Sequence, residues 1–342
     1  MSASLEKVIS IIIPVYQASG TLKKCVLSCL SQRNIDPKEV EVILVDDGST
    51  DESGKICDEY AAAYSLFTVI HIENAGVANA RNMGIDASHG QYIMFIDGDD
   101  FIAPQMIEIL FSIHSKDKDC ISCCDMVEFQ NGEDIVFNAD VINVESYDIN
   151  VFAESMFSFP RKIAYPSTVT CKLFPKELIG ERRFRKTICE DNVFNTEVII
   201  NQCRLVKFTN AKLYAYRRHD NSTMAQLDNV GKKFVDRCNV QYLIYQLLPK
   251  ENAYARGLNL SYLHFRLLYS RYQVKQHHTK NSDEYHYAQR VLKDLRRKTI
   301  KDFVTNKYIP WGKKISYLLY ESFPKLYSLK LLIDYRLFHK YS

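Results

Sequence analysis

The sequence has no stretch of roughly 18 uninterrupted apolar residues, the length that a membrane-spanning helix needs. Its N-terminus, MSASLEKVISIII, enters an apolar run directly and shows no signal-peptide cleavage pattern. Neither sign of charge predominates, because the sequence has 44 Lys and Arg and 41 Asp and Glu, which give a net charge of +3. We therefore expect a protein on the cytoplasmic side of the membrane that does not bind nucleic acid.

Two glycine-rich phosphate loops are absent as well. A GxxxxGKS/T loop would indicate a P-loop phosphotransferase, and GxGxxG would indicate a dinucleotide oxidoreductase. Neither occurs in this sequence. Any phosphates that the protein binds must therefore be held by a metal ion and by side chains.

Ten cysteines raise the question of disulfides or zinc. Cys120 and Cys123 have CxxC spacing, but no second CxxC and no HxxxH completes a zinc site. In a long chain without a secretory signal, buried free thiols are the better interpretation. Cys25 and Cys29, spaced i,i+4 on an expected helix, should pack in the core.

Short apolar strands alternate with helices along the first part of the chain, which has 342 residues and room for about two domains. This alternation predicts βαβ units, hence an α/β fold with a mostly parallel central sheet flanked by helices. The expected strands are 8–14, 40–45, 68–72 and 91–96, and the expected helices are about 21–32, from 51 onward, and within 74–90.

The alternation fades after further strands at 119–124 and 127–129. Between residues 152 and 216 the pattern is mixed, with strands expected at 168–174 and 204–208 around a helix from about 191 to 201. From Val230 onward the chain reads as helical. We expect a catalytic domain at 1–220 and a helical region at 221–342, joined by Arg217–Ser222.

Carboxylates follow two of the expected buried strands. Asp97, Asp99 and Asp100 surround Gly98 after the strand at 91–96, and Asp46 and Asp47 follow the strand at 40–45. Because the carboxyl ends of parallel strands gather ligands, the two acidic turns should lie close together. A divalent cation is the simplest compensating charge for three carboxylates, and a solvated acidic turn is the alternative.

A calcium-binding EF-hand does not explain the turn at Asp97. Phe101 and Ile102 stand where such a loop needs an oxygen ligand and a glycine, and a strand precedes it rather than a helix. Two carboxylate clusters at neighbouring strand ends suit a nucleotide diphosphate instead. One carboxylate can accept from a base or ribose, while another holds the metal that neutralises the phosphates.

The ordered motifs along residues 8–220 resemble the family 2 glycosyltransferases, which have the GT-A fold. The motifs are Ile11-Ile12 with Pro14-Val15-Tyr16, Val45–Asp51 (VDDGSTD), Asn74-Ala75-Gly76 with Ala80-Arg81-Asn82 and Gly84, Phe95–Asp100 (FIDGDD), and Glu190-Asp191. The resemblance implies an enzyme that transfers a sugar from a nucleotide-sugar donor to an acceptor hydroxyl.

For the base of the donor, the resemblance implies contacts at the ends of the first two strands. Asp47 would accept a hydrogen bond from the base, and Asp46 would support its turn. Pro14, Val15 and Tyr16 would shape the base pocket. Turn capping by the two aspartates is the alternative.

For the diphosphate, the resemblance implies a bound Mn²⁺ or Mg²⁺. Asp97 would contact the ribose or the ion, Asp99 would ligate the ion, and Gly98 would lie against the nucleotide between them. Asp100 would support this turn. Arg81 would face the nucleotide, with a solvated helix arginine as the alternative.

For the acceptor, the resemblance places the general base at Asp191, which would take the proton of the attacking hydroxyl in an inverting transfer. Glu190 would contact the acceptor sugar. Helix capping by Asp191 is the alternative. Arg217 and Arg218 would contact the diphosphate, unless they form a solvated basic linker.

The segment 301–342 combines eight Lys and Arg with many aromatic and leucine residues. It suits either a helix at a membrane interface, which a lipid-linked glycan acceptor would explain, or an ordinary helical subdomain. The expected donor is a UDP-hexose or UDP-N-acetylhexosamine, and the expected acceptor is a growing surface glycan. The alternatives are a non-catalytic glycan-binding protein, and a sugar-1-phosphate nucleotidyltransferase, which would need a basic glycine-rich loop where Tyr16–Gly20 stands.

Overall fold

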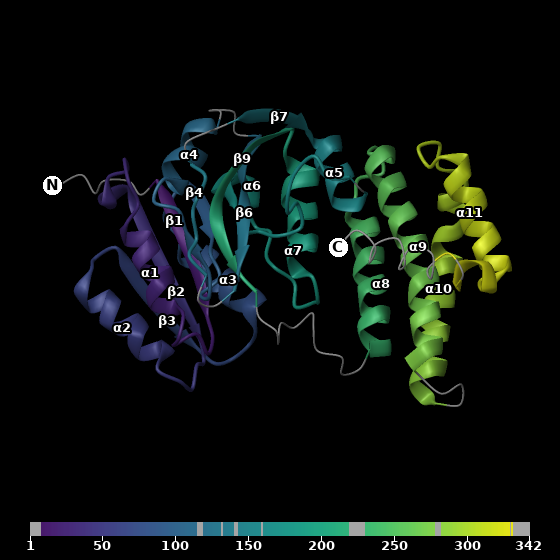
Figure 1. The fold of residues 1–342 in the computed structure, drawn as a ribbon, viewed down its shortest axis with the longest axis horizontal. Helices are drawn as coiled ribbons and strands as arrows, with labels where there is room; N and C mark the ends of the chain where they lie inside the picture. Colours follow the sequence, from purple (N-terminus) through teal and green to yellow (C-terminus); the bar gives the residue numbers. More distant parts are fainter. Residues whose placement is uncertain are drawn as a thin grey trace. The chain divides into compact units, whose positions relative to one another are not determined.

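The computed structural model describes residues 8–114, 119–130, 133–139, 143–158, 160–218, 230–277, 282–328 and 330. The chain forms two compact units (Figure 1), one from the described residues of Met1–Met156 and Pro160–Ala225, the other from those of Gln226–Ser342 with Phe157–Phe159. The expected boundary at 220, and most of the expected linker, lie outside the described residues. The roles expected for 1–220 and 221–342 stay predictions.

The N-terminal half of the sheet is parallel, as the strand–helix alternation predicts. Four strands pair in the order β3-β2-β1-β4, and a helix follows each of the first three. The elements are β1 (Ile9–Val15), α1 (Leu22–Leu30), β2 (Val40–Asp47), α2 (Ser53–Ala63), β3 (Phe67–Ile72), α3 (Val77–Ala87) and β4 (Tyr92–Phe95).

The other half of the sheet is mixed. Strand β8 (Lys172–Pro175) runs antiparallel to both β4 and β6 (Cys120–Phe129), and β9 (Leu205–Arg217) runs parallel to β6. Two edge strands, β5 (Phe101–Ile102) and β7 (Val144–Asp148), pair antiparallel with β9. The carboxyl ends of β1, β2, β4, β6 and β9 therefore meet at one edge of the sheet, as they would in a fully parallel sheet.

Three elements of this half differ from the expected ranges. The two strands expected at 119–129 are the single strand β6, interrupted by a register shift around Asp125. Strand β9 continues to Arg217 instead of ending near 208. The strand expected from residue 168 begins only at Lys172, since Tyr165 and Cys171 adopt positive φ and the backbone before Lys172 bonds to side chains.

Four short helices connect these strands. The helix expected at 191–201 begins one residue earlier and changes midway into a π-helical turn. They are α4 (Met106–Ile113), α5 (Ile149–Phe157), α6 (Lys176–Ile179) and α7 (Glu190–Asn195), the last continued by the π-helical turn Thr196–Ile200.

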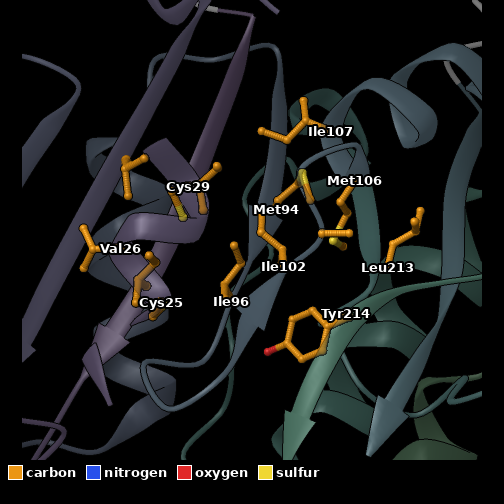
Figure 2. Packing of buried hydrophobic residues seen from close by; sticks show 14 of the residues in the cluster. Cys25, Val26, Cys29, Met94, Ile96, Ile102, Met106, Ile107, Leu213 and Tyr214 are labelled. Atoms are coloured by element: carbon orange, nitrogen blue, oxygen red, sulfur yellow. The ribbon is translucent and has the colours of Figure 1, made fainter. Parts of the chain in front are cut away.

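Alternating side chains of the sheet supply two cores. The face of β1 that carries Ile9, Ile11 and Ile13 belongs to the main cluster, to which α1, α2 and α4 contribute. Figure 2 shows part of this cluster, in which α1 faces residues that follow β4. The opposite face of β1 carries Ile12, which packs so closely on α3 that a Cβ on Gly84 would lie 2.3 Å from it.

All ten cysteines are free, as expected for a chain of buried thiols. Cys25 and Cys29 lie on the inner face of α1, where Figure 2 shows them beside Val26. Burial raises the pKa of Cys29 to about 12, so its thiol stays protonated at neutral pH. The CxxC cysteines are buried in β6, without a disulfide.

The second unit is helical, as the sequence from Val230 predicts. Ser282 begins α10 by accepting a hydrogen bond from the backbone N–H of Tyr285 at 3.2 Å. In the parts of the chain that the structure describes, no helix is both long and apolar enough to cross a bilayer. The helices bounded within the described residues are α8 (Val230–Leu247), α9 (Ala253–His277), α10 (Asp283–Thr305) and α11 (Trp311–Ser322), and residues 324–328 are helical as well.

Candidate active site

Asp46 and Asp47, at the end of β2, both form hydrogen bonds within the neighbouring turns. Asp46 accepts from the backbone N–H of Ser49 at 3.1 Å and bonds the His71 ring at 2.8 Å. Hydrogen bonds to Asp46 and Asp58 raise the pKa of His71. Asp46 therefore holds the turn that follows β2 through the Ser49 N–H.

Asp47 joins the β2 turn to the segment before α3. Its two carboxylate oxygens accept from the backbone N–H groups of Ala75 and Gly76, each at 2.8 Å. Gly48 makes this approach feasible, because it adopts φ +69° and a Cβ there would lie 2.8 Å from the backbone nitrogen of Asn74. Asp47 is buried, so a nucleotide base would meet it only at an oxygen that already accepts one bond.

The end of β1 lies beside this turn. Val15 is buried, Pro14 is half-buried, and the Tyr16 ring is 53% exposed. The side chain of Gln17 fixes the loop by donating to Thr50 Oγ1 at 3.0 Å and accepting from its backbone N–H at 2.9 Å. An exposed aromatic ring on a fixed loop is a suitable surface for a planar base.

The turn Asp97–Asp100, here called the DGDD turn, follows β4 and packs against β1. The carbonyl of Pro14 lies 3.2 Å from where a Cβ of Gly98 would stand. Asp100 is 1% exposed beneath the turn, and its carboxylate accepts from the Tyr214 hydroxyl at 2.6 Å and the Arg217 N–H at 2.8 Å. Burial, followed by the charges of Asp97 and Asp99, raises the pKa of Asp100 to about 9.

Arg81 gathers three carboxylates from two distant parts of the chain. It donates to Asp97 Oδ1 at 2.9 Å, Glu190 Oε1 at 3.0 Å and Asp191 Oδ1 at 2.7 Å. These four residues are called the Arg81 cluster. The Arg81 side chain is only 4% exposed, which rules out a solvated helix arginine. Burial lowers its pKa, but the three carboxylates outweigh burial and raise it.

Asp191 is placed by the start of α7 and by a second contact. The N-cap of α7 is Cys189, so Asp191 does not cap the helix. Its Oδ2 accepts from the backbone N–H of Val169 at 3.1 Å. Burial raises the pKa of Asp191 to about 6, with Glu190 and Asp97 acting in the same direction and Arg81 opposing them. A carboxylate with this pKa suits proton transfer near neutral pH.

The segment 165–168, which leads to Val169, is fixed by two buried side chains. Lys172 Nζ donates to the carbonyls of Tyr165 and Thr168, the former at 3.1 Å. Asn195 Nδ2 lies within 3.1 Å of the carbonyls of Pro166, Ser167 and Thr168. Together these side chains hold four consecutive carbonyls.

The two arginines at the end of β9 lie in different surroundings. Arg217 is buried, donates from Nε to the Asp99 carbonyl at 2.9 Å and covers the Phe129 ring at 4.7 Å. Arg218 is exposed and pairs with Glu128 at 3.6 Å. Arg217 thus belongs to the support of the DGDD turn, while Arg218 lies at the surface.

The donor set of the DGDD turn fits a cation that phosphate oxygens complete. In the described ranges, no three His, Cys, Asp or Glu side chains converge as a ready metal site. Mg²⁺ is usually held by one or two carboxylates together with substrate phosphates, and Asp97 and Asp99 would offer it such hard oxygen ligands. The Nε–H of Arg81 is buried without an acceptor in the described part of the chain, so a further anion would find a donor there.

Three side chains that contact the candidate site or its support were not predicted from the sequence: Tyr214, Lys172 and Asn195. The Tyr214 hydroxyl accepts a hydrogen bond from the backbone N–H of Asp97 at 3.2 Å and donates one to the Asp100 carboxylate. Its position in YAYRR, just before the basic pair, was the available signal. Lys172 stands inside an apolar run and Asn195 inside a helix, and a polar residue in such a place indicates a buried contact without revealing the partner.

Comparison with known proteins gives a consistent result. A family model described as glycosyl transferase family 2 matches residues 10–179. Glycosyltransferase GlyG of Streptococcus pneumoniae is 32% identical over 239 residues, which are 64% of this chain and 74% of GlyG. Glycosyltransferase GlyA of the same organism is 30% identical over 214 residues, covering 61% of this chain but 30% of GlyA.

Among solved structures, S. aureus TarS 1-349 in complex with UDP-GlcNAc resembles this chain with a TM-score of 0.64. The likeness covers 91% of this chain and 92% of TarS 1-349, at 17% sequence identity. At this identity the comparison bears on the fold. The α/β fold with a helical C-terminal region, as the sequence predicts, is thereby confirmed.

Proposed function

Because the chain belongs to glycosyl transferase family 2, as its motifs predict, we propose that it transfers a hexose or N-acetylhexosamine from a UDP-linked donor to a growing surface glycan. The single observation that supports this most is the Arg81 cluster. It brings a carboxylate of the DGDD turn and the Glu190–Asp191 pair to one guanidinium. A displacement at the anomeric carbon needs such closeness, because the diphosphate leaves from one side of that carbon while the acceptor hydroxyl, which gives its proton to the base, attacks from the other side.

The proposed base pocket lies at the ends of β1 and β2. Pro14, Val15 and Tyr16 form one side, with the Tyr16 ring available for stacking. Asp47 accepts from the base, and Asp46 holds its turn. The UDP-GlcNAc that S. aureus TarS carries in its complex supports a uridine donor for a chain of the same fold.

The proposed diphosphate site is the DGDD turn. Asp99 and Asp97 would hold Mn²⁺ or Mg²⁺, which when bound neutralises the leaving diphosphate. Gly98 keeps the turn against β1, and Asp97 also faces the ribose. Arg81 places its positive charge next to the same turn. Arg217 stabilises the turn by donating a hydrogen bond to the Asp99 carbonyl. Arg218, at the surface, is the proposed second diphosphate contact.

Asp191 is the proposed general base. It would take the proton of the acceptor hydroxyl as that oxygen attacks the anomeric carbon from the face opposite the diphosphate, which inverts the configuration. Arg81 and the Val169 N–H orient the two carboxylate oxygens. Glu190 would contact the acceptor sugar. The acceptor is proposed to be lipid-linked and presented at the cytoplasmic face of the cell membrane.

Replacing Asp191 by Asn tests this assignment. Sugar transfer should fall by about 10²–10⁴-fold while donor affinity is retained, because only the proton acceptor is lost. Glu181→Gln, which neutralises an exposed carboxylate nearby in sequence, is the matched control and should transfer normally. Unaltered transfer by the Asp191→Asn variant would remove Asp191 from the mechanism.

Two other functions make different predictions for the same protein. A non-catalytic glycan-binding protein would consume no nucleotide sugar under any conditions. A sugar-1-phosphate nucleotidyltransferase would release pyrophosphate from a nucleoside triphosphate, and Tyr16–Gly20 offers no Lys or Arg for that chemistry. We therefore favour sugar transfer.

A further inference from the structure

Helix α11 has two apolar faces. One of them is buried against neighbouring helices, and the other is exposed. On the inner face, Tyr317 is buried against His264 of α9 and Phe303 of α10, with ring centroids 4.7 and 5.1 Å apart. The other face, with its continuation past the helix end, is called the outer face of α11. It consists of Trp311 (70% exposed), Ile315, Leu318, Leu319, Phe323 and Leu326, each at least 41% exposed.

The helical members of the outer face lie on one side of α11. They are spaced by four, three and one residues, the spacing that gathers side chains on one side of a helix. A single exposed leucine needs no explanation, whereas four large apolar side chains on one side of a helix, followed in the chain by the exposed Phe323 and Leu326, indicate a binding surface.

The charges around this face are positive. Lys307, Lys313 and Lys325 are exposed. Across residues 303–328, the only carboxylate in the sequence is Glu321, which pairs with Arg271 at 2.7 Å and Arg296 at 2.9 Å. The negative charge of this segment is therefore neutralised within the unit, and the lysines remain unopposed by carboxylates of their own segment.

We propose that the outer face of α11 docks the protein on an anionic lipid surface. Trp311 and the leucines would enter the interface, and the three lysines would meet the headgroups. Lysine is depleted in the cores of protein–protein interfaces, so this composition favours lipid over a second copy of the chain. Since no described helix can cross a bilayer, the contact is peripheral.

This docking gives the proposed enzyme its lipid-linked acceptor, but the docking itself does not depend on the proposed reaction. Vesicle binding is measured without donor or acceptor. A failed transfer assay would therefore leave the vesicle result unaffected, and the reverse also holds.

Trp311 is the only tryptophan in the chain, so its fluorescence reports on the outer face alone. The full chain should float with phosphatidylglycerol vesicles and much less with phosphatidylcholine vesicles, and added salt should weaken the binding. With the anionic vesicles, tryptophan emission should shift to shorter wavelength and acrylamide quenching should decrease.

The double variant Ile315→Glu with Leu319→Glu should bind anionic vesicles about tenfold or more weakly, because each added carboxylate resists burial and repels the headgroups. Tyr287→Glu on α10 is the matched control, because Tyr287 is 47% exposed and Leu319 is 46% exposed. Vesicle binding of the Tyr287→Glu variant should change less than about twofold. Donor hydrolysis should be unchanged in both variants.

Three results would overturn the proposal. Failure of the wild-type chain to bind anionic vesicles is the first. Protection of Trp311 from acrylamide without lipid, in a protein that light scattering shows to be dimeric, would assign the face to a second copy. The same protection in a monomer would assign it to residues of the chain itself.

Discussion

More carboxylates surround Arg81 than its single positive charge can neutralise. Its guanidinium faces Asp97, Glu190 and Asp191, so the cluster has a formal excess of two negative charges. A cluster that served stability alone would balance its charges, because unpaired carboxylates near a buried site are costly. Burial, helped by the charges of Glu190 and Asp97, raises the pKa of Asp191. The excess negative charge leaves the site able to attract a cation.

Removing the guanidinium should therefore affect both folding and activity. Arg81→Met leaves three carboxylates without their partner, and we expect a loss of about 3 kcal/mol in the free energy of unfolding, measured by urea denaturation. We take the low end of the usual range because Asp97, Glu190 and Asp191 keep 33%, 19% and 21% exposure.

Arg183→Met is the matched control for this measurement. Arg183 pairs at 2.6 Å with Asp86, and both side chains are substantially exposed. Its loss should cost less than about 1 kcal/mol. Equal losses in the two variants would mean that Arg81 is an ordinary ion pair.

The pKa of Asp191 predicts the pH dependence of transfer. Burial raises it to about 6, and a general base acts only when it is ionised. The rate constant kcat/KM should therefore rise about tenfold per pH unit below pH 6 and level off above it. A pH profile that is flat from about pH 5 to 7 would contradict the assignment.

At the scale of elements, the segment 165–169 positions the proposed base from outside the Arg81 cluster. Lys172 and Asn195 capture the four carbonyls of residues 165–168, and the next N–H, that of Val169, meets Asp191. Burial lowers the pKa of Lys172, the expected cost of an ammonium inside the fold. The hydrogen bonds that Lys172 donates to the carbonyls of Tyr165 and Thr168 offset this cost and hold the segment in one conformation.

Replacing Lys172 by Met should loosen this segment and lower kcat by about tenfold, with little change in KM for the donor, because the proposed donor pocket lies at the ends of β1 and β2. Lys176→Met is the matched control. Lys176 Nζ also donates to a backbone carbonyl, that of Ser88, at 2.5 Å, but it does not contact the segment 165–169. A matching loss of kcat in both variants would indicate a general effect on folding.

At the scale of the whole molecule, local patterns predicted the first half of the sheet and its acidic ends. Strands β1 and β2 are short β-branched runs that enter turn residues, a pattern readable within a single window. The antiparallel insertion of β8 was not predicted, because its four residues carry no signal for their partners. Pairing between distant strands depends on tertiary packing.

The candidate site follows the same division. The VDDGS and DGDD turns are contiguous in sequence, so their carboxylates could be identified directly. The contacts of Arg81 with Glu190 and Asp191 span 109 and 110 residues, and no local pattern encodes such a pairing. Arg81, Asp97 and Asp191 were each expected in the site, but their assembly on one guanidinium comes only from the fold.

The most direct test of the central claim is consumption of nucleotide sugars. Purified protein is incubated with UDP-, GDP- and dTDP-linked sugars, with Mn²⁺ or EDTA, and release of the nucleoside diphosphate is measured. We predict release from a UDP-linked hexose or N-acetylhexosamine, which EDTA abolishes and Asp99→Ala greatly reduces. Failure to consume any nucleotide sugar, or release that persists with EDTA and in the Asp99→Ala variant, would contradict the account.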